Sequence, residues 1–253
     1  MKRILGIMGA MAEEIDEVKT MLVDVKSVEV GGRAFYSGTI NGIECVVVFS
    51  KWGKVAASIT ASILIGRFAI TELLFVGTAG ALAEGLKIGD IVVGQRLVQH
   101  DLDARPMIPR FELPLLNRVY VNSDVRLTGL AVCAVSKLLD RGVVQVMGEK
   151  NAKEFSILAP ALVLGDIASG DQFVNSAAKR NSILSEFPDI QCVEMEGAAV
   201  AQVCFEFGLP FAIIRVISDT ADHNARIDFI RFVREVANAY AKAIVNEMTL
   251  LWD

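Results

Sequence analysis

The chain alternates between short apolar runs and longer segments that have apolar residues at helical spacing. Runs typical of buried strands lie at residues 3–9, 72–76, 91–98, 143–147, 161–168 and 211–217. Segments with a helical pattern lie at residues 12–23, 54–68, 123–139, 175–187, 197–207 and 227–251. This alternation of strands and helices predicts an α/β fold.

Residues 25–50 have a different pattern, with three segments rich in β-branched residues. Asn41-Gly42 separates the second segment from the third and is a strong signal for a two-residue hairpin. We therefore expect a meander here that is antiparallel in part. Two further local signals are a turn at residues 77–81, after the strand at 72–76, and Ser123 as the N-cap of the helix that follows it.

No repeat and no linker divides the sequence, so we expect one domain over residues 1–253. The predicted architecture has three layers, with a mixed central β-sheet flanked by helices. Ligands bind beyond the carboxyl ends of strands in such sheets. Polar or glycine-rich turns follow several predicted strands, and we expect one cleft to collect those at residues 10–14, 77–81, 170–175, 194–197 and 218–222.

Composition narrows the class of protein. Hydrophobic residues make up 53% of the chain and charged residues only 22%, which favours a folded globular protein. The net charge is −5 and no dense Lys/Arg run is present, which argues against nucleic acid as a partner. No apolar run is long enough to span a bilayer. The four cysteines have no Cys-x-x-Cys spacing, so we expect reduced thiols and a cytoplasmic protein.

Three acidic residues, Glu14, Glu196 and Asp219, are the main candidates for chemistry. Glu194 and Glu196 lie between apolar and small residues, where a carboxylate requires compensation. Structural salt bridges and a functional pocket both remain open as explanations. Asp219 ends a long apolar strand, whereas Glu14, next to Glu13, is by itself typical of a solvated first-turn acid. If Glu14, Glu196 and Asp219 share one cleft, they suit hydrolysis of a glycosidic bond.

Other motifs carry weaker signals. Residues 6–11 form a degenerate dinucleotide fingerprint that lacks its third glycine, and the nearby acids would repel a pyrophosphate. An NAD-dependent oxidoreductase is therefore a poor candidate. The histidines, His100 and His223, share no metal-ligand spacing with cysteine, and we expect no metal and no cofactor. Phe173 is a candidate for stacking on a flat base, and Trp52 is ambiguous between core and site.

Six motifs, taken together and in order, resemble those of the methylthioadenosine/S-adenosylhomocysteine nucleosidases, which belong to the nucleoside phosphorylase-like superfamily. The resemblance covers nearly the whole chain. The motifs are Gly9-Ala10-Met11-Ala12-Glu13-Glu14, Gly77-Thr78-Ala79-Gly80, Gly89-Asp90-Ile91-Val92, Gly170-Asp171-Gln172-Phe173-Val174, Val193-Glu194-Met195-Glu196 and Arg215-Val216-Ile217-Ser218-Asp219.

The resemblance implies a nucleoside phosphorylase-like fold and hydrolysis of 5′-substituted adenosines such as methylthioadenosine, S-adenosylhomocysteine or 5′-deoxyadenosine. It implies that Glu14 activates the attacking water. Asp219, with Ser218 beside it, is implied to protonate N7 of adenine. Glu196 is implied to hold the ribose 2′ and 3′ hydroxyls, with the Met195 backbone alongside.

The resemblance also assigns the remaining contacts to the substrate. It implies that Phe173 stacks on adenine and that the Val174 backbone pairs with the edge of the base. The floor under base and ribose is implied to be Thr78, Ala79 and Gly80, and the residues flanking the 5′ substituent are implied to be Met11, Trp52 and Phe229.

Several alternatives remain open. Phosphorylases of this superfamily bring arginines to the phosphate, whereas this chain has Glu13 and Glu14, which favours water. The 5′ substituent is also open, because an aminodeoxyfutalosine nucleosidase resembles this pattern too. A nucleoside-binding sensor is a third alternative, but the chain retains all three candidate acids.

In the family, the loop at residues 104–118 enters the neighbouring subunit's pocket, so a homodimer is implied. Arg105 in this loop is either solvated or meets a carboxylate on the substrate tail.

Overall fold

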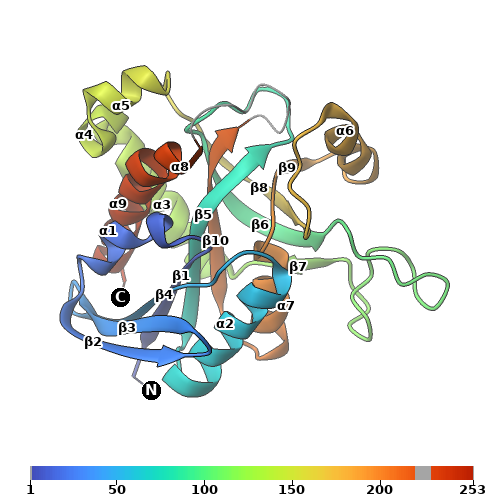
Figure 1. Cartoon of the computed structure of the whole chain (residues 1–253), viewed down its shortest axis with the longest axis horizontal. Helices are drawn as coiled ribbons and strands as arrows, with labels where there is room; N and C mark the ends of the chain where they lie inside the picture. Colours follow the sequence, from blue (N-terminus) through green and yellow to red (C-terminus); the bar gives the residue numbers. More distant parts are fainter. Residues whose placement is uncertain (1, 220–228, 253) are drawn as a thin grey trace.

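The computed structural model describes residues 2–219 and 229–252, and the strands in this part of the chain belong to one mixed sheet (Figure 1). The sheet runs in the order β10-β6-β8-β9-β5-β1-β4-β3-β2, with β7 paired to β6. This confirms the predicted α/β class and mixed central sheet. The strands are β1 (Ile4–Gly9), β2 (Val23–Val30), β3 (Arg33–Ile40), β4 (Ile43–Phe49), β5 (Glu72–Ala81), β6 (Ile91–Gln99), β7 (Tyr120–Asn122), β8 (Leu162–Ser169), β9 (Ile190–Glu194) and β10 (Phe211–Asp219).

Five of these strands close into a ring. Strand β5 pairs with both β9 and β10, and β10 continues through β6 and β8 back to β9. Strands β1, β4, β3 and β2 extend outward from β5, and β7 is attached to β6. β2, β3 and β4 are antiparallel neighbours, as the hairpin signal at Asn41-Gly42 predicts, and β4 is parallel to β1.

Helices cover both faces of the sheet, and the strand side chains alternate between the two layers. Leu74 and Val76 of β5 belong to one hydrophobic core, whereas Leu73 and Phe75 belong to the other. The first core includes side chains from the helices α1 (Asp16–Lys19), α3 (Val125–Arg141), α4 (Val143–Met147), α5 (Glu149–Glu154), α8 (Phe229–Phe232) and α9 (Asn238–Leu250), and from the π-helix η2 (Val233–Ala237). The second lies under α2 (Lys54–Phe68) and α7 (Gly197–Glu206), which pack against each other. Helix α6 (Ala177–Glu186) contributes to a third, smaller cluster.

The predicted helix at residues 12–23 is wrong in its extent. The structure has a short 3-10 helix, η1 (Ala12–Glu14), followed by α1, and strand β2 begins at Val23. The cause is local, because the Glu14 carboxylate accepts hydrogen bonds from the backbone N–H groups of Ala10 and Met11. These bonds favour a tight turn over a regular helical start.

Two other local predictions are wrong. Residues 77–81 are not a turn, because Gly77 to Gly80 pair with β10, with a register shift before Gly80, and Ala81 pairs with β9, so β5 extends to Ala81. Residues 143–147 are helical, as α4, and not a strand. An apolar run of five residues does not distinguish the two, and Val143 and Met147 are buried at the i, i+4 spacing of a helix.

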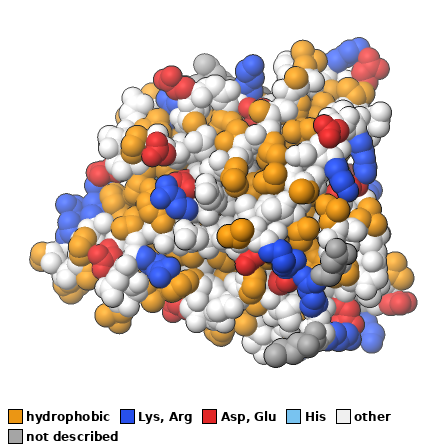
Figure 2. All heavy atoms as spheres, turned by 180° about the vertical axis from the view of Figure 1, so that it is seen from behind, with side chains coloured by type: hydrophobic (Ala, Val, Ile, Leu, Met, Phe, Trp, Pro, Cys, Tyr) orange, Lys and Arg blue, Asp and Glu red, His pale blue; other side chains and the backbone are white. Residues whose placement is uncertain are grey.

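The remaining predicted elements lie close to their observed bounds. Helix α2 has the predicted bounds, and the helix predicted at residues 227–251 is found over its described part as α8, η2 and α9. No helix in the described part of the chain is long and apolar enough to span a membrane. On the face seen in Figure 2, the described Lys and Arg side chains lie among acidic and hydrophobic ones, without a continuous basic patch.

The N-cap of α3 is Asp124 and not the predicted Ser123. The Asp124 carboxylate accepts a hydrogen bond from the Leu127 N–H at 2.9 Å, whereas the buried Ser123 hydroxyl has no hydrogen-bond partner. We expect Asp124→Ala to lower the free energy of unfolding by about 1 kcal/mol, because a helix N–H loses its acceptor. Ser123→Ala should change it by less than about 0.5 kcal/mol. Urea denaturation of both variants measures the difference, and a larger effect for Ser123→Ala would contradict this assignment of the cap.

Candidate active site

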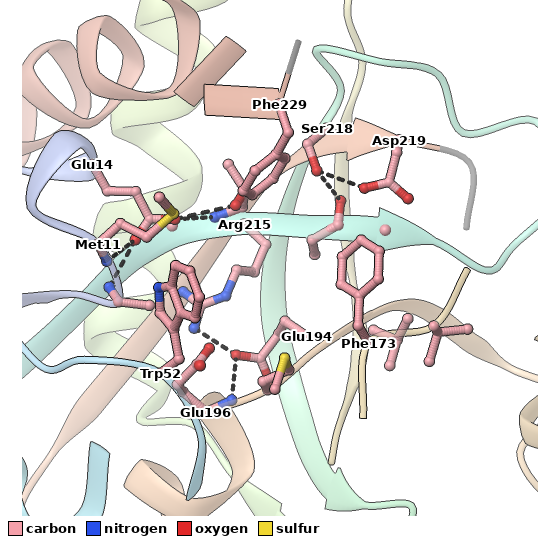
Figure 3. Close-up of a pocket in the computed structure, with 18 of the residues that line it drawn as sticks. Met11, Glu14, Trp52, Phe173, Glu194, Glu196, Arg215, Ser218, Asp219 and Phe229 are labelled. Atoms are coloured by element: carbon pink, nitrogen blue, oxygen red, sulfur yellow. Dashed lines mark hydrogen bonds and ion pairs between the residues drawn. The ribbon is translucent and has the colours of Figure 1, made fainter. Parts of the chain in front are cut away.

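The carboxyl ends of several strands converge on one cavity of about 400 Å³. Its lining comes from segments far apart in the sequence, as the pattern of strand ends predicts (Figure 3). Of the turn predicted at residues 218–222, positions 220–222 lie outside the described residues, as does His223. Each of the thirteen predicted site residues lines the cavity, namely Met11, Glu14, Trp52, Thr78, Ala79, Gly80, Phe173, Val174, Met195, Glu196, Ser218, Asp219 and Phe229.

Glu14 is buried and its carboxylate is held by four hydrogen bonds. Oε2 accepts from the backbone N–H groups of Ala10 at 2.7 Å and Met11 at 3.0 Å. Oε1 accepts from the Thr78 N–H at 3.0 Å and from the Thr78 hydroxyl at 3.1 Å. Burial raises the pKa of Glu14, while Arg215 and these backbone donors oppose the rise. Gly77 permits this placement, because a Cβ there would lie 3.1 Å from Oε1.

A buried ion pair forms part of the cavity lining. Arg215 Nη2 is 2.8 Å from Glu194 Oε2, and the two side chains are only 1% and 3% exposed. Burial alone would lower the pKa of Arg215, but Glu194, Glu14 and Glu196 raise it, so the guanidinium stays charged. It also lies over the ring of Phe75. The ion pair is the salt bridge that the sequence left open as an explanation for Glu194.

Glu194 also fixes the start of helix α7. Its carboxylate accepts hydrogen bonds from the backbone N–H of Glu196 at 3.0 Å and of Gly197 at 2.9 and 2.8 Å, and from the Ser169 hydroxyl. Because Glu194 already accepts from these N–H groups at the start of α7, the Glu196 side chain is not needed to cap the helix. The carboxylate of Glu196 instead accepts from the Gly53 N–H at 2.8 Å.

The pKa of Glu196, like that of Glu14, is raised in the folded protein. Burial, with the nearby charge of Glu194, raises the pKa of Glu196 to about 8, while the Gly53 N–H and Arg215 act in the opposite direction. At neutral pH the carboxyl group therefore exchanges between its two protonation states. A positive charge that develops in the cavity would favour the carboxylate.

Asp219 lies at the other end of the cavity, with Ser218 and Phe173 (Figure 3). The Ser218 hydroxyl donates to Asp219 Oδ2 at 2.8 Å and lies 3.3 Å from the carbonyl oxygen of Ala79. Strand pairing places Asp219 opposite Gly80 of β5. The carboxylate is thus set beside the floor of the cavity by two neighbouring strands.

Apolar and aromatic side chains form most of the remaining wall. Phe173 is exposed, whereas Val174, next to it, is buried. Trp52 is 65% exposed and lies with Met11 near Glu14 and Glu196 (Figure 3). A cavity with flat apolar surfaces and a few buried carboxylates suits a small ligand that carries both a flat ring and hydroxyl groups.

Comparison with known proteins identifies the family. The model of the Phosphorylase superfamily matches residues 4–249. The chain belongs to this superfamily.

Relatives within the superfamily match over nearly their full length. An aminodeoxyfutalosine nucleosidase of Helicobacter pylori strain J99 is 38% identical over 239 residues, which are 94% of this chain and 95% of that protein. A 5′-methylthioadenosine/S-adenosylhomocysteine nucleosidase of Staphylococcus carnosus is 33% identical over 98% of this chain and 100% of that protein. The crystal structure of the enzyme of the same name from Neisseria meningitidis, in complex with methylthio-immucillin-A, has a TM-score of 0.83, 34% identity and 98% coverage of both chains. The fold is thus nucleoside phosphorylase-like, as the sequence predicts.

Sequence reasoning missed two contributions to the site of this superfamily member. Arg215 was visible as the one polar residue in an apolar strand, but nothing in the sequence named its partner. Glu194 was grouped with Glu196, although the two have different surroundings. The cavity is also lined by Ala10, Gly77, Gln172 and Val193, which belong to the six motifs but were assigned no role.

Other candidates stay outside the cavity. Arg105, in the loop at residues 104–118, is exposed and pairs with Asp103 at 2.6 Å. His100 lies outside the cavity lining, and its Nε2 is buried without a hydrogen-bond partner. Within residues 2–219 and 229–252, no cluster of three or more His, Cys, Asp or Glu side chains is arranged to hold a metal ion.

The raised pKa of Glu196 predicts how stability depends on pH. Folding raises this pKa from 4.5 to about 8, so the folded state binds the proton more tightly than the unfolded chain. The resulting stabilisation is fully present below about pH 4.5 and is lost as the pH rises through about 8. We therefore expect the free energy of unfolding to fall more steeply across this range in the wild type than in Glu196→Gln.

Urea denaturation of both proteins across the range measures this difference. His100, whose pKa is lowered, is present in both proteins and cancels in the comparison. Glu14 interacts with Glu196, so the difference between the two curves also contains the change in the Glu14 pKa. Parallel curves for the two proteins would mean that folding does not raise the pKa of Glu196.

Proposed function

We propose that this protein is a hydrolase that cleaves the N-glycosidic bond of 5′-substituted adenosines and releases adenine. The observation that carries the proposal is the presence of three buried carboxylates, Glu14, Glu196 and Asp219, on one cavity whose other walls are largely apolar. Separated carboxylates of this kind can divide the work of acid, base and charge stabilisation. The named relatives support this reading, since they are nucleosidases.

Bond cleavage passes through a sugar with oxocarbenium character. The electron pair of the glycosidic bond leaves with adenine, and water attacks the anomeric carbon of the sugar. Glu14 accepts a proton from this water. Burial suits it to that role, because a raised pKa makes the carboxylate a stronger base. Of the four donors that hold Glu14, the Thr78 hydroxyl is the rotatable one, so it can turn toward the water.

Asp219 supplies the proton that adenine needs to leave as a neutral base. It donates this proton to N7, and the Ser218 hydroxyl, 2.8 Å from Oδ2, keeps the carboxyl group oriented. Glu14 and Asp219 lie at different ends of the cavity in Figure 3, which leaves room for a nucleoside between them. The base end of the substrate then lies toward Asp219 and the attacking water toward Glu14.

The remaining lining residues divide between base, ribose and 5′ substituent. Phe173 stacks on adenine and the Val174 backbone pairs with the edge of the base. Glu196 holds the 2′ and 3′ hydroxyls, with the Met195 backbone alongside, and its charge stabilises the oxocarbenium. The other assignments follow the position of each residue on the cavity, with Thr78, Ala79 and Gly80 as the floor and Met11, Trp52 and Phe229 around the 5′ side.

Charge favours water over phosphate as the nucleophile. Among the described residues that line the cavity, Arg215 is the one cation, and Glu194 already pairs with it at 2.8 Å. The Glu14 carboxylate lies in the same cavity and would repel a phosphate dianion. Hydrolysis is therefore the better reading, with a purine nucleoside phosphorylase as the alternative that phosphate dependence would support.

The 5′ substituent is the open part of the substrate. Methylthioadenosine and S-adenosylhomocysteine fit the names of the Staphylococcus carnosus and Neisseria meningitidis relatives. A second candidate is aminodeoxyfutalosine, favoured by the name of the Helicobacter pylori relative at 38% identity. The exposed Trp52 face at the cavity offers a flat surface to either kind of substituent.

We further propose a cytoplasmic homodimer in which residues 1–253 form one domain and the loop at residues 104–118 reaches the partner's cavity. The loop projects from the body of the molecule in Figure 1 and carries Met107 and Leu115, which are 84% and 94% exposed. Val55 and Ile59, also exposed, lie one helical turn apart on α2 and follow Trp52. The four cysteines are free thiols, which suits a reducing compartment.

The activity is tested by adenine release from methylthioadenosine, S-adenosylhomocysteine and aminodeoxyfutalosine, each with and without phosphate. We expect release from at least one substrate that does not depend on phosphate. Asp219→Asn should lower turnover by about a hundred- to ten-thousand-fold, because the leaving base loses its proton donor. Binding of a non-hydrolysable substrate analogue should survive in this variant. Phosphate-dependent turnover would overturn the hydrolase reading, and equal loss of turnover and binding would remove the acid role of Asp219.

The dimer is tested by sedimentation of a double variant, Met107→Glu with Leu115→Glu. We expect the wild type to sediment as a dimer and the variant as a monomer with reduced adenine release, because two charges would have to be buried at the interface. Leu158→Glu is the matched control, since Leu158 is 81% exposed and lies outside both α2 and the loop. A monomeric wild type, or a dimer that survives the double substitution, would contradict this assembly.

A further inference from the structure

Three charged residues outside the cavity lining form a closed set of hydrogen bonds. Lys54 Nζ donates to Asp101 Oδ1 at 2.6 Å, and Asp101 Oδ2 accepts from the Asp171 N–H at 2.8 Å. Asp171 Oδ1 in turn accepts from the Lys54 N–H at 2.8 Å, which closes the circuit. Lys54 Nζ also donates to Gln99 Oε1 at 3.1 Å. We call Lys54, Asp101 and Asp171 the clamp.

The clamp joins three elements that are distant in sequence. Lys54 begins helix α2, Asp101 follows β6 and Asp171 follows β8. The Lys54 and Asp101 side chains are only 18% and 16% exposed, so their ion pair is largely shielded from water. Although burial acts against it, Lys54 and the Asp171 N–H lower the pKa of Asp101, so this carboxylate is ionised at neutral pH.

The segment that the clamp fixes also contacts the site. Gly53, next to Lys54, donates its N–H to Glu196 Oε1 at 2.8 Å, and Trp52 lines the cavity. The N–H groups of Gly53 and Lys54 therefore point to two different carboxylates, Glu196 and Asp171. Gly53 has a φ of 88°, and a Cβ there would lie 3.0 Å from Asp171 Oδ1, so this close approach requires glycine.

We propose that Lys54, Asp101 and Asp171 are positioning residues that hold residues 52–54 in place, so that the Gly53 N–H reaches the Glu196 carboxylate. None of the three lines the cavity, so they act through Gly53 and Trp52 and not on the substrate. The proposal rests on the proposed function, in which Glu196 binds the ribose hydroxyls and stabilises the developing positive charge.

The physical consequence concerns the charge state of Glu196. This carboxyl group faces Glu194 and Glu14, which raise its pKa together with burial, and Arg215 and the Gly53 N–H, which lower it. Loss of the Gly53 donor removes one of the two opposing contributions. The pKa of Glu196 then rises further and less carboxylate is present at neutral pH. His100 lies beside the clamp, but burial lowers its pKa, so it adds no charge at neutral pH.

The experiment compares Lys54→Met, Asp101→Asn and the double variant with the wild type. The ¹³C resonance of the Glu196 carboxyl group, assigned with Glu196→Gln, reports its pKa without any need for turnover. We expect the pKa to rise in both single variants. The acid limb of the kcat/KM profile for adenine release should move to higher pH, with kcat/KM near neutral pH reduced about ten- to a hundredfold. The double variant should lose no more than the larger single loss, because the pair acts as one unit.

Two further variants separate positioning from general stability. Lys54→Arg keeps the ion pair with Asp101 and should restore most of the activity. Arg96→Met breaks the ion pair between Arg96 on β6 and Asp166 on β8, which joins neighbouring elements without touching the cavity, and should leave the Glu196 pKa unchanged. Thermal melts confirm that each variant is folded.

An unchanged pKa of Glu196 in a folded Lys54→Met or Asp101→Asn protein would overturn the proposed positioning role of the clamp. A shift of the Glu196 pKa in Arg96→Met as large as in these variants would also overturn it. If the wild type releases no adenine while the carboxyl titration still shifts as expected, the proposed function fails and the clamp stands.

Discussion

The site depends on the buried ion pair between Arg215 and Glu194. Glu14, Glu194 and Glu196 are drawn together in a place that excludes water, and such a cluster is unfavourable unless a cation compensates it. Arg215 is that cation, at 1% exposure and 2.8 Å from Glu194. Removing one partner of such a pair costs about 3–5 kcal/mol, because the other charge stays buried. Arg215 thus opposes the rise that burial causes in the pKa of Glu14 and of Glu196.

The strand ring makes this arrangement possible. Glu194 ends β9, Arg215 lies in β10 and Thr78 lies in β5, and these strands are hydrogen-bonded neighbours. Because β5 pairs with both partners, the distances among the three side chains are set by backbone pairing and not by flexible loops. Gly77 then leaves the space in which the Glu14 carboxylate lies against β5. Backbone hydrogen bonds, a missing side chain and one cation together define the polar end of the cavity.

Much of this organisation was predictable from the sequence. The bounds of α2 were correct because Gly53 precedes a segment with apolar residues at helical spacing, which ends next to Ala69 in a left-handed conformation. The residues that line the cavity could be predicted because strand ends in an α/β sheet meet at one edge, and because six motifs resembled a family. Residues 143–147 were misjudged because a run of five apolar residues fits a strand or a helix equally well.

Other features were beyond sequence reasoning for a physical reason. The partner of Arg215, the cap at Asp124 and the bond between Lys54 and Asp101 depend on which polar atoms meet after folding. Lys54 and Asp101 are 47 positions apart, and no local pattern relates them. The same holds for residues 77–81, whose glycines suggested a turn until pairing with β10 drew them into the sheet.

The residues that line the cavity come from two parts of the fold, and the two parts differ in how freely they can change within the superfamily. Thr78, Glu194 and Asp219 come from strands of the closed ring, whereas Met11, Trp52 and Phe229 come from segments outside it. Evolution can remodel the latter without disturbing the barrel-like frame that supports the former. Variation confined to the segments outside the ring would alter the 5′ side of the cavity alone, and relatives that match nearly the whole chain do bear the names of different substrates.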